Sequence, residues 1–160
     1  MDTAFLVSVL SRWTHVGSAI VLIGGTAFIR LVLVPVLSNH PPEIMDQIRA
    51  RWKKFVHIGI LLFLLSGVYN YMTLIGKHKG DSLYHALVGT KMLLALVVFF
   101  IGSALVGRSS GTQKIRDQAA KWMALMLLLS AIIVGISGFV KVRPYEASGT
   151  APAETAQSDE

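Results

Sequence analysis

The sequence predicts an all-α integral membrane protein, a bundle of four transmembrane helices with both termini on the same side of the bilayer. Its mean hydropathy is +0.59 and 15% of its residues are charged, against about a quarter in soluble proteins. Four apolar runs account for this composition: residues 16–37, 55–76, 86–107 and 122–140. Each run is long enough for an α-helix to cross roughly 30 Å of hydrocarbon.

The chain is expected to form one four-helix transmembrane domain over residues 1–143, followed by a disordered tail over 144–160. Proline and acid at positions 42 and 43 suit a helix start, and Asp81 or Ser82 and then Thr112 are candidate N-caps for the later helices. The tail contains mainly Ala, Ser, Thr, Glu and Pro without apolar periodicity. The helices are expected at about residues 8–37, 43–75, 83–107 and 114–141.

Composition also excludes several classes of protein. The absence of cysteine excludes disulfides, thiolate metal sites, iron–sulfur clusters and covalent c-type haem attachment. The net charge of +6 does not indicate nucleic-acid binding, because the basic residues lie in short loops beside apolar runs, as membrane topology requires. The first residues lack the basic region of a cleavable signal, so the first helix is expected to remain as an anchor.

The distribution of Lys and Arg predicts the orientation. Eight of these residues flank the two connections on one side: Arg49, Arg51, Lys53, Lys54, Arg108, Lys114, Arg116 and Lys121. Five lie on the side of the termini: Arg12, Lys77, Lys79, Lys141 and Arg143. The positive-inside rule therefore places both termini outside, in the periplasm if the membrane is the inner membrane of a bacterium.

The polar residues inside the spans fall into two groups by depth. Taking the midpoint of each run as the bilayer centre and 1.5 Å per residue gives each residue's height. The outer group contains His15, Asn70, Tyr71, His85 and Lys91. The inner group contains Arg30 and His57. Ionisable groups at membrane depth are costly, so each needs a partner or a task.

Helical periodicity predicts which of these residues share a face. His15, Thr26 and Arg30 form one stripe on the first helix, whereas Lys91 and His85 lie about 120° apart on the third. The two residues on the third helix therefore do not face the same cavity. On the second helix, one face contains Gly59, Phe63, Ser66 and Asn70. On the fourth, Ala131, Gly135 and Gly138 have the small-residue spacing of close helix packing.

Each polar residue also has an ordinary structural interpretation. His85, beside a hydrophilic turn, is more readily explained as an interfacial hydrogen-bonding residue than as a ligand, and His57 as a headgroup-zone residue. Arg30 either extends to the inner interface, pairs with a lipid phosphate, or holds an anionic group there. Lys91 either extends toward the outer interface or takes part in a site with the hydroxyl, amide and imidazole groups at its depth.

The sequence resembles a known group of families. Arg12-Trp13-Thr14-His15-Val16-Gly17, followed by two glycines and Arg30, resembles the opening helix of the copper resistance protein D (CopD) family. It is also similar to the HemJ-type protoporphyrinogen oxidases. The segments ending in Leu-Ser-Gly-Val-Tyr-Asn at residue 70 and running from His85 to Lys91 are similar to the next two helices, and the likeness spans about residues 10–140.

The resemblance implies a four-helix bundle in a bacterial inner membrane. HemJ-type proteins bind b-type haem and oxidise protoporphyrinogen, and their important helix 1 histidine and helix 3 lysine correspond to His15 and Lys91. The chain departs from their helix 3 pattern because His85 precedes Lys91 by six residues instead of two. CopD proteins are longer, and Met72, Met92, Met123 and Met126 form no evident cluster on the outer side.

The leading hypothesis is a membrane protein that binds b-type haem near its outer face, with a redox role in protoporphyrinogen oxidation or electron transfer. His15 would be an axial ligand, with His85 or, less favoured, His57 as the second, and Lys91 would pair with a propionate. One alternative is a copper-handling protein using His15, His85 and Met92. Another is a non-catalytic accessory subunit. The expected partners are the lipid bilayer, other membrane subunits or a second copy of the chain.

Overall fold

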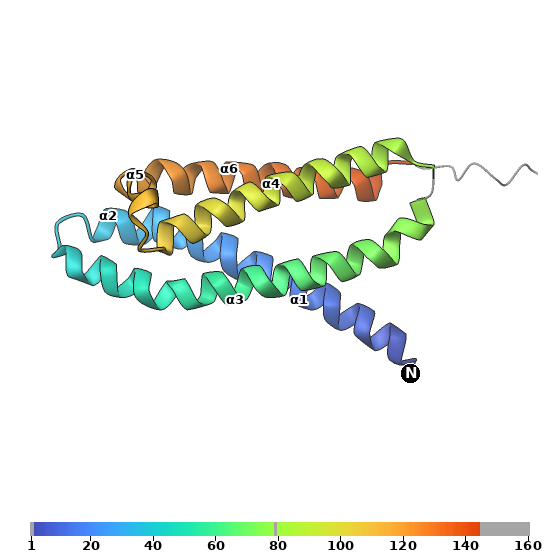
Figure 1. Cartoon of the computed structure of the whole chain (residues 1–160), viewed down its shortest axis with the longest axis horizontal. Helices are drawn as coiled ribbons and strands as arrows, with labels where there is room; N and C mark the ends of the chain where they lie inside the picture. Colours follow the sequence, from blue (N-terminus) through green and yellow to red (C-terminus); the bar gives the residue numbers. More distant parts are fainter. Residues whose placement is uncertain (1, 79, 145–160) are drawn as a thin grey trace, which may run out of the picture.

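The computed structural model describes residues 2–78 and 80–144. All regular elements within these residues are helices. Four continuous helical segments are long and apolar enough to cross a membrane: Thr3–Val36, Pro42–Ile75, Ser82–Val106 and Ala119–Val142. The N-terminus and the end of the last segment lie at the same end of the bundle (Figure 1). The prediction of an all-α four-helix membrane bundle is therefore confirmed, and the chain is a multi-pass membrane protein.

The first segment is one long helix with a local change of winding. Helix α1 (Thr3–Phe28) continues through a π-helical turn (Ile29–Leu33) into α2 (Val34–Val36). The amide of Val34 donates to the carbonyl of Ile29, five residues earlier. Pro35 explains this widening, because it has no N–H for the carbonyl of Leu31 and its ring crowds that carbonyl. Helix α1 begins at Thr3, earlier than predicted, because the Asp2 side chain accepts a hydrogen bond from Ala4 N at 3.2 Å.

The remaining helices follow the predicted boundaries closely. Helix α3 (Pro42–Ile75) starts at the predicted proline, and a short 3₁₀ turn (Gly76–His78) leads toward α4 (Ser82–Val106). The fourth segment differs, because a 3₁₀ turn (Ser110–Thr112), α5 (Gln113–Asp117) and α6 (Ala119–Val142) replace one uninterrupted helix. Thr112 precedes α5 as predicted but makes no capping hydrogen bond to that helix. The tail predicted to be disordered lies outside the described residues from 145 onward.

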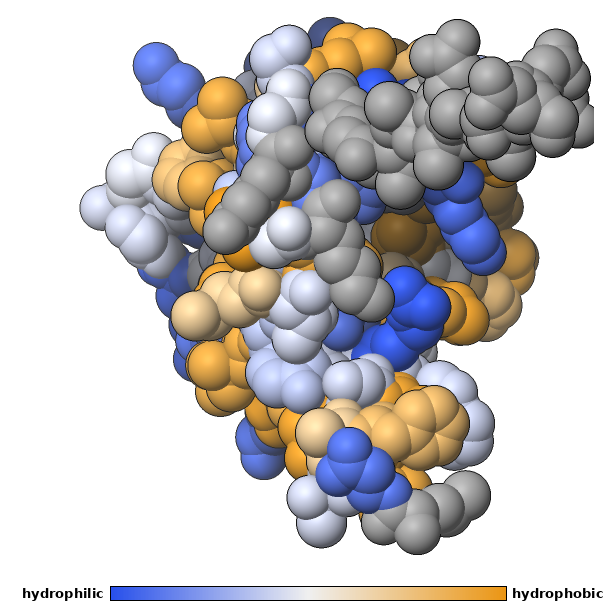
Figure 2. Space-filling view, turned by 90° about the vertical axis from the view of Figure 1, so that its right-hand side faces the viewer, coloured by the Kyte–Doolittle hydropathy of each residue, from blue (hydrophilic) through white to orange (hydrophobic). Residues whose placement is uncertain are grey.

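The bundle consists of two helix pairs, α1 with α3 and α4 with α6 (Figure 1). The N-terminal part of α1 points away from α4 and α6, and its apolar residues Phe5, Leu10 and Trp13 are exposed. Such exposure suits side chains that face lipid. The end of the bundle that carries the termini is different, because hydrophilic residues gather in its middle and hydrophobic residues lie around them (Figure 2).

A buried ion pair closes this end of the bundle. Asp81 caps α4 by accepting a hydrogen bond from Tyr84 N at 2.9 Å, and its other carboxylate oxygen pairs with Arg143 at the end of α6. His78 Nδ1 lies 3.8 Å from the same oxygen, and its ring stacks on Tyr84 with centroids 3.9 Å apart. The Asp81 and Arg143 side chains are only 4% and 10% exposed. The pair therefore joins the start of α4 to the end of α6 away from water.

Replacing Asp81 with Asn should destabilise the bundle by about 3–5 kcal/mol, because the buried charge pair with Arg143 is broken while the amide can still cap α4. The measurement is reversible unfolding in mixed micelles. Asp46→Asn is the matched control, because Asp46 pairs with Arg49 at an exposed site, at 3.5 Å. That change should cost less than about 1 kcal/mol. Equal losses in the two variants would contradict the structural role of the buried pair.

Candidate functional site

His15 lies at the contact between α1 and α3, and its hydrogen bonds determine its tautomer. Its Nδ1 is 3.1 Å from the carbonyl oxygen of Phe63 and 3.2 Å from the hydroxyl of Ser66. A carbonyl oxygen can only accept, so Nδ1 carries the proton and Nε2 carries the lone pair of the neutral ring. Nε2 makes no hydrogen bond with another described side chain or backbone group. This arrangement, with one nitrogen anchored and the other free, is typical of histidines that ligate metals.

Aromatic and glycine contacts fix the imidazole ring. It lies against Phe63 with centroids 3.9 Å apart, and Phe63 in turn meets Phe99 of α4 edge-on at 5.3 Å. A Cβ added at Gly67 would lie 3.1 Å from His15 Cε1. Phe63 and Gly67 thus confine the ring, while the hydrogen bonds set its rotation.

A polar seam continues from His15 toward the end with the termini. Ser11 Oγ lies 3.3 Å from both the carbonyl oxygen of Ser66 and Oδ1 of Asn70. One turn further, the hydroxyls of Ser8 and Tyr69 are 3.4 Å apart. The predicted face of the second helix, which includes Phe63, Ser66 and Asn70, is therefore the face that meets α1. Asn70 supports the packing beside His15 and is already hydrogen-bonded within the seam.

Lys91 of α4 is half-buried and lies near enough to His15 for an electrostatic interaction. Among the described residues, it has no hydrogen bond or ion pair. An unpaired ammonium in a membrane-spanning helix is costly, so an anionic group of a ligand would be favoured beside it. Tyr71 is also half-buried.

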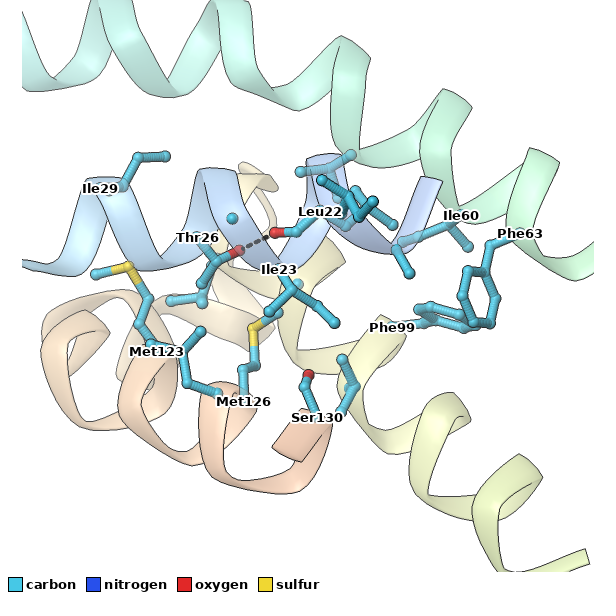
Figure 3. A pocket seen from close by; sticks show the side chains of 18 of the residues that line it. Leu22, Ile23, Thr26, Ile29, Ile60, Phe63, Phe99, Met123, Met126 and Ser130 are labelled. Carbon is cyan, nitrogen blue, oxygen red and sulfur yellow. Dashed lines mark hydrogen bonds between the residues drawn. The ribbon is translucent and has the colours of Figure 1, made fainter. Parts of the chain in front are cut away.

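A narrow apolar cavity extends inward from His15 between the two helix pairs. It has a volume of about 540 Å³ and is lined by residues of α1, α3, α4 and α6. Phe63 and Phe99 lie together at one end of the labelled lining residues, with Met123, Met126 and Thr26 farther along (Figure 3). The lining is almost entirely apolar, and Arg49 is its only formally charged member among the described residues.

The structure does not bring the other candidate metal ligands to His15. His85 is half-buried, does not line the cavity, and packs edge-on against Tyr84 with centroids 5.5 Å apart. Met92 is 37% exposed and also lies outside the cavity lining. His57 is exposed, and its Nδ1 lies 2.8 Å from the carbonyl of Lys53 in its own helix. The expectation that His85 and Lys91 face different surroundings agrees with this placement.

Arg30 lies apart from these residues, in the π-helical turn. Its Nε donates to the carbonyl of Ala120 in the first turn of α6, at 3.0 Å. This bond ties the inner part of α1 to α6 and gives the half-buried Arg30 a partner inside the protein. His57 has no part in this contact, so the two inner residues act separately.

Within residues 2–78 and 80–144, no group of three or more His, Cys, Asp or Glu residues is placed to hold a metal ion. Any iron at His15 would therefore come with its own equatorial ligands, as in haem. Comparison of the chain with protein-family models, curated proteins and solved structures finds no match. The resemblance to the CopD and HemJ families stays a prediction. A function can be proposed only from the geometry of the site.

Two groups at the site were not identified from the sequence as contacts of His15. The carbonyl of Phe63 carries no sequence signal, and Gly67 looks like any small residue of a membrane helix. Helical periodicity in the sequence placed Ser66 on the same face as Asn70. This placement was the signal for the position of Ser66 at the interface. Ser130 of α6, buried in the cavity wall, was not singled out.

Replacing Gly67 with Ala should displace the His15 ring, because the added methyl would lie 3.1 Å from Cε1 and 3.4 Å from Nδ1. We expect a weaker Nδ1 hydrogen bond, seen as a shift of the imidazole ¹⁵N resonances. Gly89→Ala is the control, since a Cβ there meets nothing within 4 Å. Both changes bring the same gain in helix propensity. Unchanged His15 resonances in the Gly67 variant would contradict the described packing.

Proposed function

We propose that the protein binds b-type haem at the outer end of its cavity, with His15 as the axial ligand. The observation that carries the proposal is the state of His15, whose Nδ1 is anchored to a backbone carbonyl while Nε2 keeps its lone pair. A neutral imidazole held in this way suits iron, and the hydrogen bond from Nδ1 increases its basicity. The donor chemistry of the site thus fits haem with a single histidine ligand.

The surroundings of His15 support the same proposal. Lys91, unpaired among the described residues and near His15, would hold a propionate, while Phe63 and Phe99 offer apolar contacts to a macrocycle. The cavity is narrow along its length, so the macrocycle belongs at the outer end, where the N-terminal part of α1 diverges (Figure 1). His85, which packs on Tyr84, is not favoured as a second ligand.

Bound haem would supply one-electron redox chemistry, and the chain would set its potential through the single imidazole and the apolar surroundings. The excess of Lys and Arg at the other end supports a bacterial inner membrane orientation with the termini in the periplasm. The site would then face the periplasmic half of the bilayer. This placement suits either electron transfer or oxidation of a porphyrinogen that reaches the site from the membrane.

The decisive measurement is the absorbance spectrum of the protein purified from haem-producing cells. The wild type should show a Soret band that shifts to longer wavelength on reduction, and His15→Ala should lose it. His85→Ala and His57→Ala are matched controls and should keep the spectrum. A colourless wild-type protein with stoichiometric copper would instead support the copper-handling alternative. Absence of both haem and metal would support the accessory-subunit alternative.

Replacing Lys91 with Gln should keep the Soret band but weaken haem retention about tenfold, because a charge-assisted bond to a propionate is lost. Transfer of haem to apomyoglobin measures this loss. Lys91→Arg restores the charge and should recover most of the retention. If Lys91→Gln retains haem as firmly as the wild type does, Lys91 does not hold a propionate.

A further inference from the structure

The cavity is elongated along α1. On α1 its lining extends from His15 to Val34, which is roughly 28 Å along the helix at 1.5 Å per residue. A volume of about 540 Å³ spread over roughly 28 Å gives a mean section of about 20 Å². Such a section accommodates one extended hydrocarbon chain, and its length approaches the thickness of the bilayer core.

One buried polar side chain in the cavity wall makes no hydrogen bond within the described residues. Ser130 is 6% exposed, lines the cavity, and makes no hydrogen bond with any described residue. Its side chain points from α6 toward the space beside Ile23 and Phe99 (Figure 3). Thr26, the other hydroxyl labelled there, already donates to the carbonyl of Leu22 at 2.7 Å. Ser130 therefore offers a free hydrogen-bond donor inside an apolar channel.

The depth of Ser130 restricts what can satisfy it. Ser130 is the twelfth of the 24 residues of α6, and so lies near the middle of the span. The polar groups of phospholipids stay outside the hydrocarbon core. A trapped water molecule needs two to four polar partners, whereas Ile23, Phe99 and Met126 around Ser130 are apolar (Figure 3). A lipophilic molecule that carries a polar acceptor within the core of the membrane would satisfy it.

We infer that the channel binds an isoprenoid quinone, with a ring carbonyl accepting a hydrogen bond from Ser130 and the tail lying along the channel. The quinone ring supplies the acceptor, and Phe99 and Ile23 provide apolar contacts to it (Figure 3). Phe63 and Phe99 mark the end of the channel near His15, so the ring site lies inward of the proposed haem. The inference depends on the channel alone and holds whether or not haem is bound.

Quinone binding is tested on the full-length protein in nanodiscs, with Trp52 as reporter because it lines the channel. Trp13 and Trp122 are replaced by Phe, so that only Trp52 responds. Decylubiquinone should quench this fluorescence saturably. Ser130→Ala should weaken binding about five- to tenfold, because one hydrogen bond to the carbonyl is lost. Ser18→Ala, buried but outside the channel lining, is the matched control and should bind normally.

A second pair of variants tests the location. Gly24 lines the channel and Gly17 does not, and a Cβ at either meets nothing within 4 Å. Gly24→Leu should abolish saturable quenching, while Gly17→Leu should leave it unchanged. Solvent extraction followed by mass spectrometry should also find quinone with the purified wild type. Non-saturable quenching that is equal in all variants, or an extract that contains phospholipid alone, would overturn the inference.

The outcome is independent of the haem proposal. His15→Ala in the same background should still bind decylubiquinone, because His15 only borders the channel at its outer end. Saturable quinone binding by a haem-free wild type would support this inference and count against the proposed function. A haem-loaded protein without saturable quinone binding would support the proposed function and overturn this inference.

Discussion

Close approach of α1 and α3 is the constraint on which the rest of the structure depends. Three glycines make it possible, because each one faces a larger side chain of the opposite helix. The ring of Trp52 occupies the place of a Cβ on Gly25, Leu22 lies against Gly59, and His15 lies against Gly67. Without these gaps, the helices would separate and His15 Nδ1 would lose the carbonyl of Phe63. In lipid, no water would replace that partner.

The two helix pairs meet without filling the space between them. At the end opposite the termini, Arg30 of the first segment reaches the carbonyl of Ala120 in α6, and farther along the bundle Phe63 of α3 meets Phe99 of α4. Between these contacts, side chains of four helices form the walls of the cavity and leave a space between them. The channel therefore lies between two helix pairs that pack closely within themselves.

The sequence predicts much of the fold but only part of the site. Apolar run length located all four spans, and helical periodicity correctly placed Ser66 and Asn70 on the face that meets His15. The small-residue face of the fourth helix has no close neighbour within the described chain, since an added Cβ at Gly135 or Gly138 meets nothing within 4 Å, and its close packing stays a prediction. Glycine spacing marks a face where helices can approach. Which helix does so depends on how the pairs assemble, and a single sequence does not show this.

Phe63 connects the two proposed sites while keeping them chemically separate. Its carbonyl accepts the His15 hydrogen bond, its ring lies against the imidazole, and the same ring meets Phe99 at the end of the channel. A movement of the imidazole would therefore reach the channel directly, since His15 itself lines it, and also through the Phe63 ring. The groups that recognise each ligand, His15 on α1 and Ser130 on α6, belong to different helix pairs. The contact of Phe63 on α3 with Phe99 on α4 is therefore a direct packing route between the two sites.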